Sequence, residues 1–144
     1  MKKLNILFVC KYNRFRSRVA ESYFNQLNKD KTINVISGGI IVGRFPLNER
    51  EVNIAKKYGV KIQGPPKPIK FEELVRQDLI IIVADNVPKE IFKSKRFDKR
   101  VIVWSIPDVY PNEKKSNLRK RVANIKKKVQ ELIKNLERQK WKLT

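Results

Sequence analysis

The 144-residue sequence contains no histidine and a single cysteine, Cys10. One cysteine cannot form an intramolecular disulfide or a multi-cysteine zinc site. Without histidine, the chain also lacks imidazole metal ligands and the Cys-His and Ser-His pairs of many hydrolases. We therefore expect no metal site of these kinds, and any acid or base must be Asp, Glu, Lys, Tyr or the thiol itself.

Long hydrophobic runs and acidic residues are also scarce. No stretch approaches the length of a membrane span, and the segment between Met1-Lys2-Lys3 and Cys10 is too short for a signal peptide, so we expect a cytoplasmic protein without membrane contact. The 34 Lys and Arg outnumber the 14 Asp and Glu, which gives a net charge of +20. This charge attracts anions and allows nucleic acid to bind non-specifically, although a solvated lysine-rich surface explains it better than a dedicated nucleic-acid site.

The length and the 41% hydrophobic content fit one compact domain over residues 1–144. Apolar runs predict strands at residues 4–9, 32–36, 78–85 and 101–104, and the third lacks alternation, as in a central parallel strand. Apolar residues at three- and four-residue spacing predict helices at 17–28, 48–59 and from about Leu118 onward, and residues 87–93 suit a short helix. Strand, helix and strand in succession indicate a parallel crossover.

Three further segments bear on this organisation. Ser37-Gly38-Gly39 is expected to break the second strand, and Asn48 to cap the helix that ends at Gly59. Gly64-Pro65-Pro66-Lys67-Pro68 reads as a stiff surface connection. Residues 114–144 contain 12 basic and 2 acidic residues, so half of the excess positive charge lies in this segment.

The segment Cys10-Lys11-Tyr12-Asn13-Arg14-Phe15-Arg16-Ser17 lies between the first predicted strand and helix. A loop of this length can direct successive backbone N–H groups at one centre, and the helix N-terminus adds its positive dipole end there. An oxyanion could bind in such a loop above a Cys10 thiolate. Taken alone, a cysteine that ends a buried strand is better explained as an inert hydrophobic residue, and only the downstream Arg16-Ser17 and Asp108 favour a nucleophile.

Four further motifs follow this loop along the chain. They are Ala20-Glu21 in the first helix, Ser37-Gly38-Gly39, Ala84-Asp85, and Trp104-x-x-Pro107-Asp108-x-Tyr110. With Val9-Cys10-x-x-Asn13-x-x-Arg16-Ser17, nearly the whole chain resembles the low-molecular-weight protein tyrosine phosphatases. The resemblance implies an α/β fold of three layers, with a four-stranded parallel sheet, helices on both faces and a phosphate-binding loop after the first strand.

The resemblance also implies a chemistry that needs neither a metal nor an organic cofactor. Cys10 would be the nucleophile, because loop amides, the helix N-terminus and a guanidinium favour its thiolate. Arg16 would hold two phosphoryl oxygens in its planar fork. Asp108 would protonate the leaving oxygen and then act as base for water, so that a cysteinyl-phosphate intermediate forms and is hydrolysed.

Further roles carry over by position. Ser17 would hydrogen-bond the thiolate and Asn13 would hold the strained loop backbone. Phosphate and other oxyanions would bind the loop residues Lys11, Tyr12, Asn13, Arg14, Phe15 and Arg16. The substrate contacts would be Tyr12, Arg44, Phe45 and Tyr110, with Asp85 behind the site.

Local readings without catalysis also exist for these residues. Asp108 could cap a turn, Ser17 could cap the first helix and Tyr110 could be a surface tyrosine.

Three residues depart from the family pattern. Tyr12 replaces a usual glycine, and it either narrows the mouth or adds a stacking surface, provided that its φ is not positive. Phe15 replaces a common second cysteine, so Cys10 lacks a partner for a protective disulfide. Arg18 replaces a common proline and is expected to add positive charge at the rim.

The favoured function is therefore hydrolysis of a phosphotyrosine protein or a small aryl phosphate. One alternative is arsenate reduction, which would need an external thiol because the chain has no second cysteine. Another is a non-catalytic module that binds oxyanions or nucleic acid. The sequence does not indicate an oligomeric state.

Overall fold

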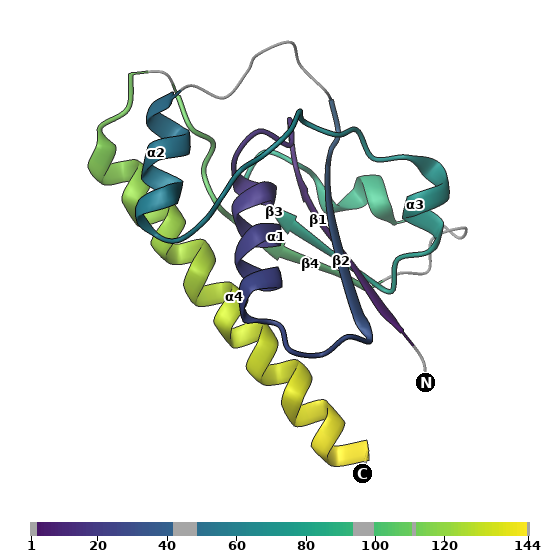
Figure 1. Cartoon of the computed structure of the whole chain (residues 1–144). Coiled ribbons are helices and arrows are strands. Elements are labelled where there is room, and N and C mark those ends of the chain that lie inside the picture. The colour runs from purple at the N-terminus through teal and green to yellow at the C-terminus, as the bar shows by residue number, and fades with distance from the viewer. Residues whose placement is uncertain (1–2, 42–48, 94–99, 111, 144) are drawn as a thin grey trace.

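A computed structural model describes residues 3–41, 49–93, 100–110 and 112–143, with one four-stranded sheet (Figure 1). The strands are β1 (Leu4–Cys10), β2 (Ile33–Gly39), β3 (Leu79–Val83) and β4 (Arg100–Trp104), in the order β2-β1-β3-β4. Every neighbouring pair is parallel. The carboxyl ends of the two central strands, β1 and β3, therefore lie side by side, where α/β folds form their sites.

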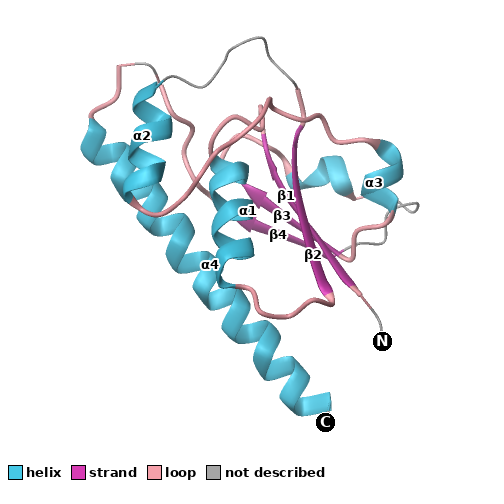
Figure 2. Ribbon diagram, viewed as in Figure 1, coloured by secondary structure: helices cyan, strands magenta, loops and turns pink. Residues whose placement is uncertain are grey.

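Helices cover both faces of this sheet (Figure 2). Helix α1 (Arg16–Leu27) and helix α4 (Lys115–Leu143) pack together on one face, with α2 (Glu49–Lys57) against α4. The short helix α3 (Phe71–Val75) and the 3₁₀ helix η1 (Lys89–Phe92) lie on the other face. The predicted three-layer α/β fold is confirmed.

The two faces of β1 explain why the central strands lack alternation. Phe8 packs with Val19 of α1 and Leu118 of α4, whereas Leu7 and Val9 pack on the opposite side. All five side chains are at most 1% exposed. A strand that is covered on both faces needs apolar residues at every position.

The predicted break of the second strand at Ser37-Gly38-Gly39 is wrong, because β2 continues to Gly39 and pairs with Cys10. Glycine is required here by a close approach of the chain. A Cβ atom on Gly39 would lie 2.8 Å from the backbone nitrogen of Asn13. Ile69 donates its backbone N–H to the Gly39 carbonyl, so the segment after the proline-rich connection lies beside the end of β2.

Helix boundaries differ from the predictions by a few residues. Residues 87–93 contain only the 3₁₀ helix η1, and α4 starts three residues before Leu118. Helix α3 was not predicted, because it spans five residues and none of them is buried. The proposed cap Asn48 lies outside the described residues.

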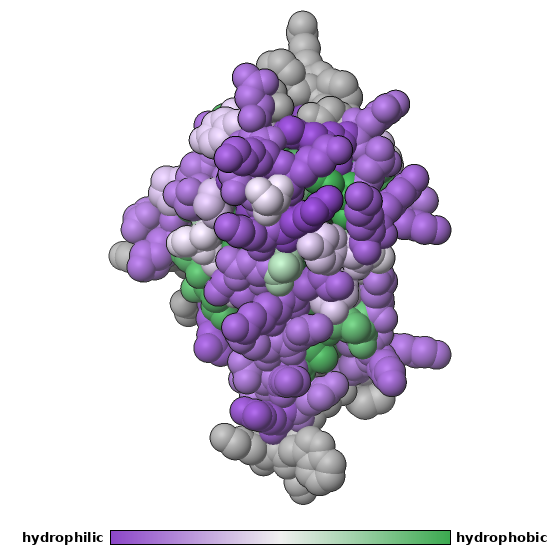
Figure 3. Space-filling view, turned by 90° about the vertical axis from the view of Figure 1, so that its left-hand side faces the viewer, coloured by the Kyte–Doolittle hydropathy of each residue, from purple (hydrophilic) through white to green (hydrophobic). Residues whose placement is uncertain are grey.

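Helix α4 is amphipathic, with a buried apolar side and a basic outer side. The stripe consists of Leu118, Val122, Ile125, Val129 and Leu132. The side of the molecule drawn in Figure 3 is largely hydrophilic, with small apolar patches. In the part of the chain that the structure describes, no helix has the length and apolar character needed to cross a membrane.

Candidate active site

The loop after β1 lies at the carboxyl edge of the sheet. Cys10 ends β1 and is 2% exposed, and α1 begins only six residues later at Arg16. Asn13, at the middle of the loop, has φ of 52° and is the only non-glycine residue with positive φ in the described ranges. Tyr12 therefore takes the place of the usual glycine and does not itself adopt a positive φ.

Asn13 holds the loop in this shape through its buried side chain, which is 1% exposed. Its Oδ1 accepts a hydrogen bond of 2.8 Å from the backbone N–H of Lys67. Its Nδ2 donates to Ser17 Oγ at 2.8 Å and to Ser37 Oγ at 3.0 Å. All its polar atoms are thus bound, which offsets a backbone conformation that costs most residues about 1–2 kcal/mol.

The same network orients the hydroxyl group of Ser17. Ser17 Oγ lies 3.0 Å from Cys10 Sγ and already accepts an N–H from Asn13. Its own hydrogen is therefore available for the sulfur, and a thiolate is the better acceptor of it. Ser37 likewise accepts from Asn13 and donates to Glu21 Oε1 at 2.8 Å.

Ser17 does not cap the first helix. Phe15 is at the N-cap position, and its side chain makes no capping hydrogen bond. Phe15 is 3% exposed and belongs to the core, so only its backbone can face a bound anion. The alternative of a purely capping Ser17 is therefore wrong.

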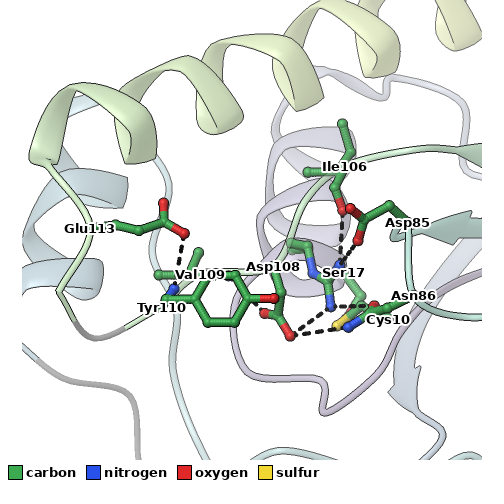
Figure 4. A network of polar contacts seen from close by, with 10 residues as sticks. Cys10, Ser17, Asp85, Asn86, Ile106, Asp108, Val109, Tyr110 and Glu113 are labelled. Atoms are coloured by element: carbon green, nitrogen blue, oxygen red, sulfur yellow. Dashed lines mark hydrogen bonds and ion pairs between the residues drawn. The ribbon is translucent and has the colours of Figure 1, made fainter.

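Arg16 is also buried, at 2% exposure, and its guanidinium is fixed by the loops after β3 and β4. Its Nη1 donates to the Ile106 carbonyl at 2.8 Å and its Nη2 donates to Asn86 Oδ1 at 3.0 Å. Its Nη1 also lies 3.7 Å from Asp85 Oδ1, and its Nη2 lies 3.3 Å from Asp108 Oδ2 (Figure 4). These partners fix the orientation of the planar fork.

Asp108 thus lies beside the loop, as the sequence predicted. Its Oδ1 accepts the backbone N–H of Val109 at 2.8 Å, and its Oδ2 accepts Asn86 Nδ2 at 3.3 Å (Figure 4). Asp108 and Cys10 line one hollow of about 10 Å³, together with Tyr12, Arg14, Phe15, Arg16, Glu51 and Val109. That space holds about one water molecule.

Glu51 is the unexpected residue of this hollow. It comes from α2, is 2% exposed, and its Oε1 lies 3.8 Å from Arg14 Nη2. Burial raises the pKa of Glu51, and the charge of Asp108 raises it further, while Arg14 and Arg50 oppose both effects.

The prediction that Arg18 adds positive charge at the rim of the site is wrong. It is 7% exposed, and its Nη2 donates to the carbonyls of Gln63 and, at 2.7 Å, Gly64. Burial lowers the pKa of Arg18, while the charges of Glu21 and Cys10 raise it. Arg18 therefore ties α1 to the proline-rich connection instead of extending the binding surface.

The remaining predicted residues are placed as follows. Lys11 Nζ lies 5.2 Å from the centre of the Tyr12 ring, and Tyr12 lines the hollow. Tyr110 is 62% exposed and lies two residues beyond Asp108. Arg44 and Phe45 lie outside the described residues.

Sequence reasoning missed Asn86 and Glu51. Asn86 follows the flagged Asp85 at the carboxyl end of β3, the edge where α/β sites form, so its position was a usable signal. Glu51 lies three and four residues before the buried Ile54 and Ala55, which places it on the inner face of α2. A glutamate on an otherwise apolar face was the available signal.

Comparisons with known proteins show the family and the fold of the chain. A family model described as low molecular weight phosphotyrosine protein phosphatase matches residues 5–142. No curated protein matches the chain significantly.

Solved structures with the same fold include three that are named for different activities. An arginine phosphatase from Geobacillus stearothermophilus has a TM-score of 0.80 at 16% identity, with 96% of each chain covered. A low molecular weight protein tyrosine phosphatase from T. tengcongensis has 0.76 at 23%, covering 92% of this chain and 99% of its own. An arsenate reductase from Archaeoglobus fulgidus has 0.71 at 24%, covering 89% and 98%. At these identities the likeness shows the fold.

Proposed function

Since the chain belongs to the low molecular weight phosphotyrosine protein phosphatase family, we propose that it hydrolyses phosphotyrosine, in a protein or as a small aryl phosphate, through Cys10, Arg16 and Asp108. The observation that carries the proposal is that these three residues line one hollow. Arg16 and Asp108 arrive there from different elements, and Asn86 bonds to both. A nucleophile, an anion clamp and a proton donor are thus in reach of one phosphoryl group.

In the first step the Cys10 thiolate attacks phosphorus. The S–P bond forms as the P–O bond to the leaving group breaks. Asp108 transfers its proton to the departing oxygen, so that the product is a neutral phenol. The Ser17 hydroxyl and the N-terminus of α1 stabilise the thiolate, and the fork of Arg16 binds two of the equatorial oxygens.

Substrate binding requires Asp108 to leave Arg16. The hollow of about 10 Å³ is too small for a phosphoryl group. Asp108 Oδ2 lies 3.3 Å from Arg16 Nη2 and so takes the place of a phosphoryl oxygen on the guanidinium. The phosphoryl oxygens replace this carboxylate on the guanidinium. Asp108 is then directed at the leaving oxygen, with Asn86 as the hydrogen-bond partner of its Oδ2.

In the second step water attacks the cysteinyl phosphate. Asp108, now ionised, accepts a proton from this water, the S–P bond breaks and the electron pair returns to Cys10 as thiolate. Inorganic phosphate leaves the loop. The cycle uses only groups of the chain and water.

The residues at the mouth of the hollow indicate which leaving group the site accepts. Tyr12 lines it, and the exposed Tyr110 ring lies two residues from the acid, so aromatic surface is available for an aryl group. A second candidate is phosphoarginine, since arginine phosphatases share the fold. The buried carboxyl group of Glu51 favours phosphoarginine as a substrate, because a guanidinium leaving group would offer positive charge and N–H donors to the two carboxyl oxygens of Glu51.

Arsenate reduction is the remaining alternative within this fold. Cys10 is the only thiol, so a bound arsenic adduct would have to be resolved by an external thiol. No contact in the described residues favours this chemistry over phosphoryl transfer. Arsenate-dependent oxidation of an added thiol, in place of steady hydrolysis of p-nitrophenyl phosphate, would support the reductase.

The proposal is tested by steady-state hydrolysis of p-nitrophenyl phosphate, phosphotyrosine peptide and phosphoarginine peptide. Wild type should hydrolyse an aryl phosphate, Cys10→Ser should be inactive, and Asp108→Asn should lower kcat far more than KM. Unchanged activity in Cys10→Ser would exclude the enzymatic mechanism. A wild type without turnover that binds RNA with a steep salt dependence would instead support a non-catalytic module.

A further inference from the structure

Tyr110 directly follows Val109, a residue that lines the hollow over Cys10. The Tyr110 ring is 62% exposed, and among the described residues none hydrogen-bonds to its hydroxyl group or packs an aromatic ring against it. Polar and aromatic contacts therefore do not fix the ring itself. Its position depends on the main chain of Tyr110, and charged side chains hold this main chain.

Glu113 binds both main-chain polar groups of Tyr110. Its Oε1 accepts the Tyr110 N–H at 3.2 Å (Figure 4), and its own backbone N–H donates to the Tyr110 carbonyl at 3.2 Å. Its Oε2 forms an ion pair with Arg121 Nη1 of α4. The two side chains of this pair are only 14% and 13% exposed, so salt screens the pair less than a surface pair. One carboxylate thus links Tyr110 to α4.

Arg50 links the same segment to α2. Its Nη1 donates to the Glu113 carbonyl at 2.6 Å, and its Nη2 donates to the Tyr110 carbonyl at 3.3 Å. A guanidinium presents its N–H donors in a rigid plane, so it can hold two carbonyl groups in a fixed arrangement. We call Arg50, Glu113 and Arg121 the Tyr110 clamp. These three side chains tie Tyr110 to two helices of the fold.

The proposed catalytic acid is held by other contacts. Asp108 is flanked by Ile106 and Val109, which are 0% and 7% exposed and pack in the core. Its Oδ1 accepts the Val109 N–H at 2.8 Å. These anchors do not involve the side chains of the Tyr110 clamp. Loss of the clamp should therefore displace Tyr110 more than Asp108.

We propose that Glu113 is a positioning residue for substrate preference: by holding the main chain of Tyr110, it places the Tyr110 ring as a wall for the aromatic leaving group of an aryl phosphate. This inference rests on the proposed phosphatase function. Glu113 touches no reacting atom and acts only through Tyr110. A wall that is already in place loses less conformational freedom when the substrate binds, and this favours binding.

A merely structural role for Glu113 predicts a different result. If the ion pair with Arg121 only stabilises the fold, its loss should affect all phosphoryl substrates alike. If Glu113 acts through Tyr110, its loss should affect only substrates with an aromatic leaving group. Acetyl phosphate provides the contrast, because it carries the same phosphoryl group on a leaving group without a ring.

The experiment measures kcat and KM of the full chain for p-nitrophenyl phosphate and acetyl phosphate. The variants are Glu113→Ala, Glu113→Gln, Tyr110→Ala, the double variant Tyr110→Ala with Glu113→Ala, and the control Glu131→Gln at an exposed position of α4. Glu113→Ala should raise KM for p-nitrophenyl phosphate by about twofold to tenfold, the range that one aromatic contact contributes to binding, with little change in kcat. KM for acetyl phosphate should stay at the wild-type value.

The other variants make the comparison specific. Glu113→Gln keeps an acceptor for the Tyr110 N–H but loses the charge that faces Arg121, so its KM should lie between those of wild type and Glu113→Ala. Tyr110→Ala should itself raise KM for p-nitrophenyl phosphate, and Glu113→Ala should add nothing in that background. Glu131→Gln should match wild type. Thermal denaturation identifies a variant that does not fold, and Glu113→Gln carries the comparison if Glu113→Ala is such a variant.

Three results would overturn the inference and leave the phosphatase intact. They are an unchanged KM in Glu113→Ala, equal increases of KM for both substrates, and an undiminished effect of Glu113→Ala without the Tyr110 ring. A wild type that hydrolyses neither substrate, or acetyl phosphate alone, would instead refute the proposed function itself.

Discussion

Replacement of Asn13 by alanine tests how the loop is held. Asn13 has φ of 52° and makes three side-chain hydrogen bonds, to Lys67 N, Ser17 Oγ and Ser37 Oγ. Alanine keeps the Cβ atom, loses all three bonds and has no local polar group to favour the left-handed conformation. We expect Asn13→Ala to be strongly destabilised.

The magnitude follows from these contacts. Each buried hydrogen bond contributes about 1 kcal/mol net, so the three together account for about 3 kcal/mol. The left-handed backbone adds about 1 kcal/mol for alanine. The total of about 4 kcal/mol corresponds to a fall in Tm of roughly 10–15 °C for a chain of this length.

Asn13→Gly is the matched control, because it loses the same hydrogen bonds but accepts positive φ. Urea or thermal denaturation of both variants should show Asn13→Gly less destabilised than Asn13→Ala by about 1 kcal/mol. Both variants should lose kcat, since Ser17 no longer has the N–H that directs its hydroxyl to Cys10. A loss of less than about 1 kcal/mol in Asn13→Ala would refute the network account.

Three other predictions concern the loop, α2 and α4. Gly39→Ala should destabilise the fold by about 2 kcal/mol or more in denaturation, because its Cβ would lie 2.8 Å from the loop backbone; wild-type stability would contradict this. Burial raises the pKa of Glu51, so the folded state loses stability as the pH rises and this carboxyl group ionises. The Tm of Glu51→Gln should therefore exceed the Tm of wild type by more at pH 7 than at about pH 4. An equal difference in Tm at both pH values would exclude burial as the cause. Single-stranded RNA should bind the basic face of α4, and replacing the exposed Lys120, Lys127 and Lys134 with Gln should reduce the salt slope by about 2; an unchanged slope would exclude that face.

The fold could be predicted because its signals are local. Each central strand is a continuous apolar run, and α4 repeats apolar residues over its whole length, so both follow from periodicity. The failures also have local causes. Gly38 and Gly39 are poor strand residues by propensity, yet β2 includes them, because Ile69 packs against Gly38 and the loop backbone packs against Gly39 too closely for a side chain.

Within the site, the resemblance to a known family supplied the candidate residues. Cys10, Arg16 and Asp108 were assigned from that family pattern, and the structure brings these three to one hollow. Asn86 and Glu51 were not assigned, since they reach the site through the tertiary packing of β3 and α2. Arg18 was misplaced because a charge on a helix is usually solvated, whereas here two backbone carbonyls, of Gln63 and Gly64, receive it.

The most direct test of the account is detection of the phosphoryl group on Cys10. Asp108→Asn should form the cysteinyl phosphate from p-nitrophenyl phosphate, whose leaving group needs little acid help, and should hydrolyse it slowly because the base for water is lost. Rapid quenching followed by peptide mass spectrometry is predicted to find the phosphoryl group on Cys10, in amounts approaching one per chain. Phosphoryl transfer to another residue, or turnover that persists in Cys10→Ser, would contradict the account.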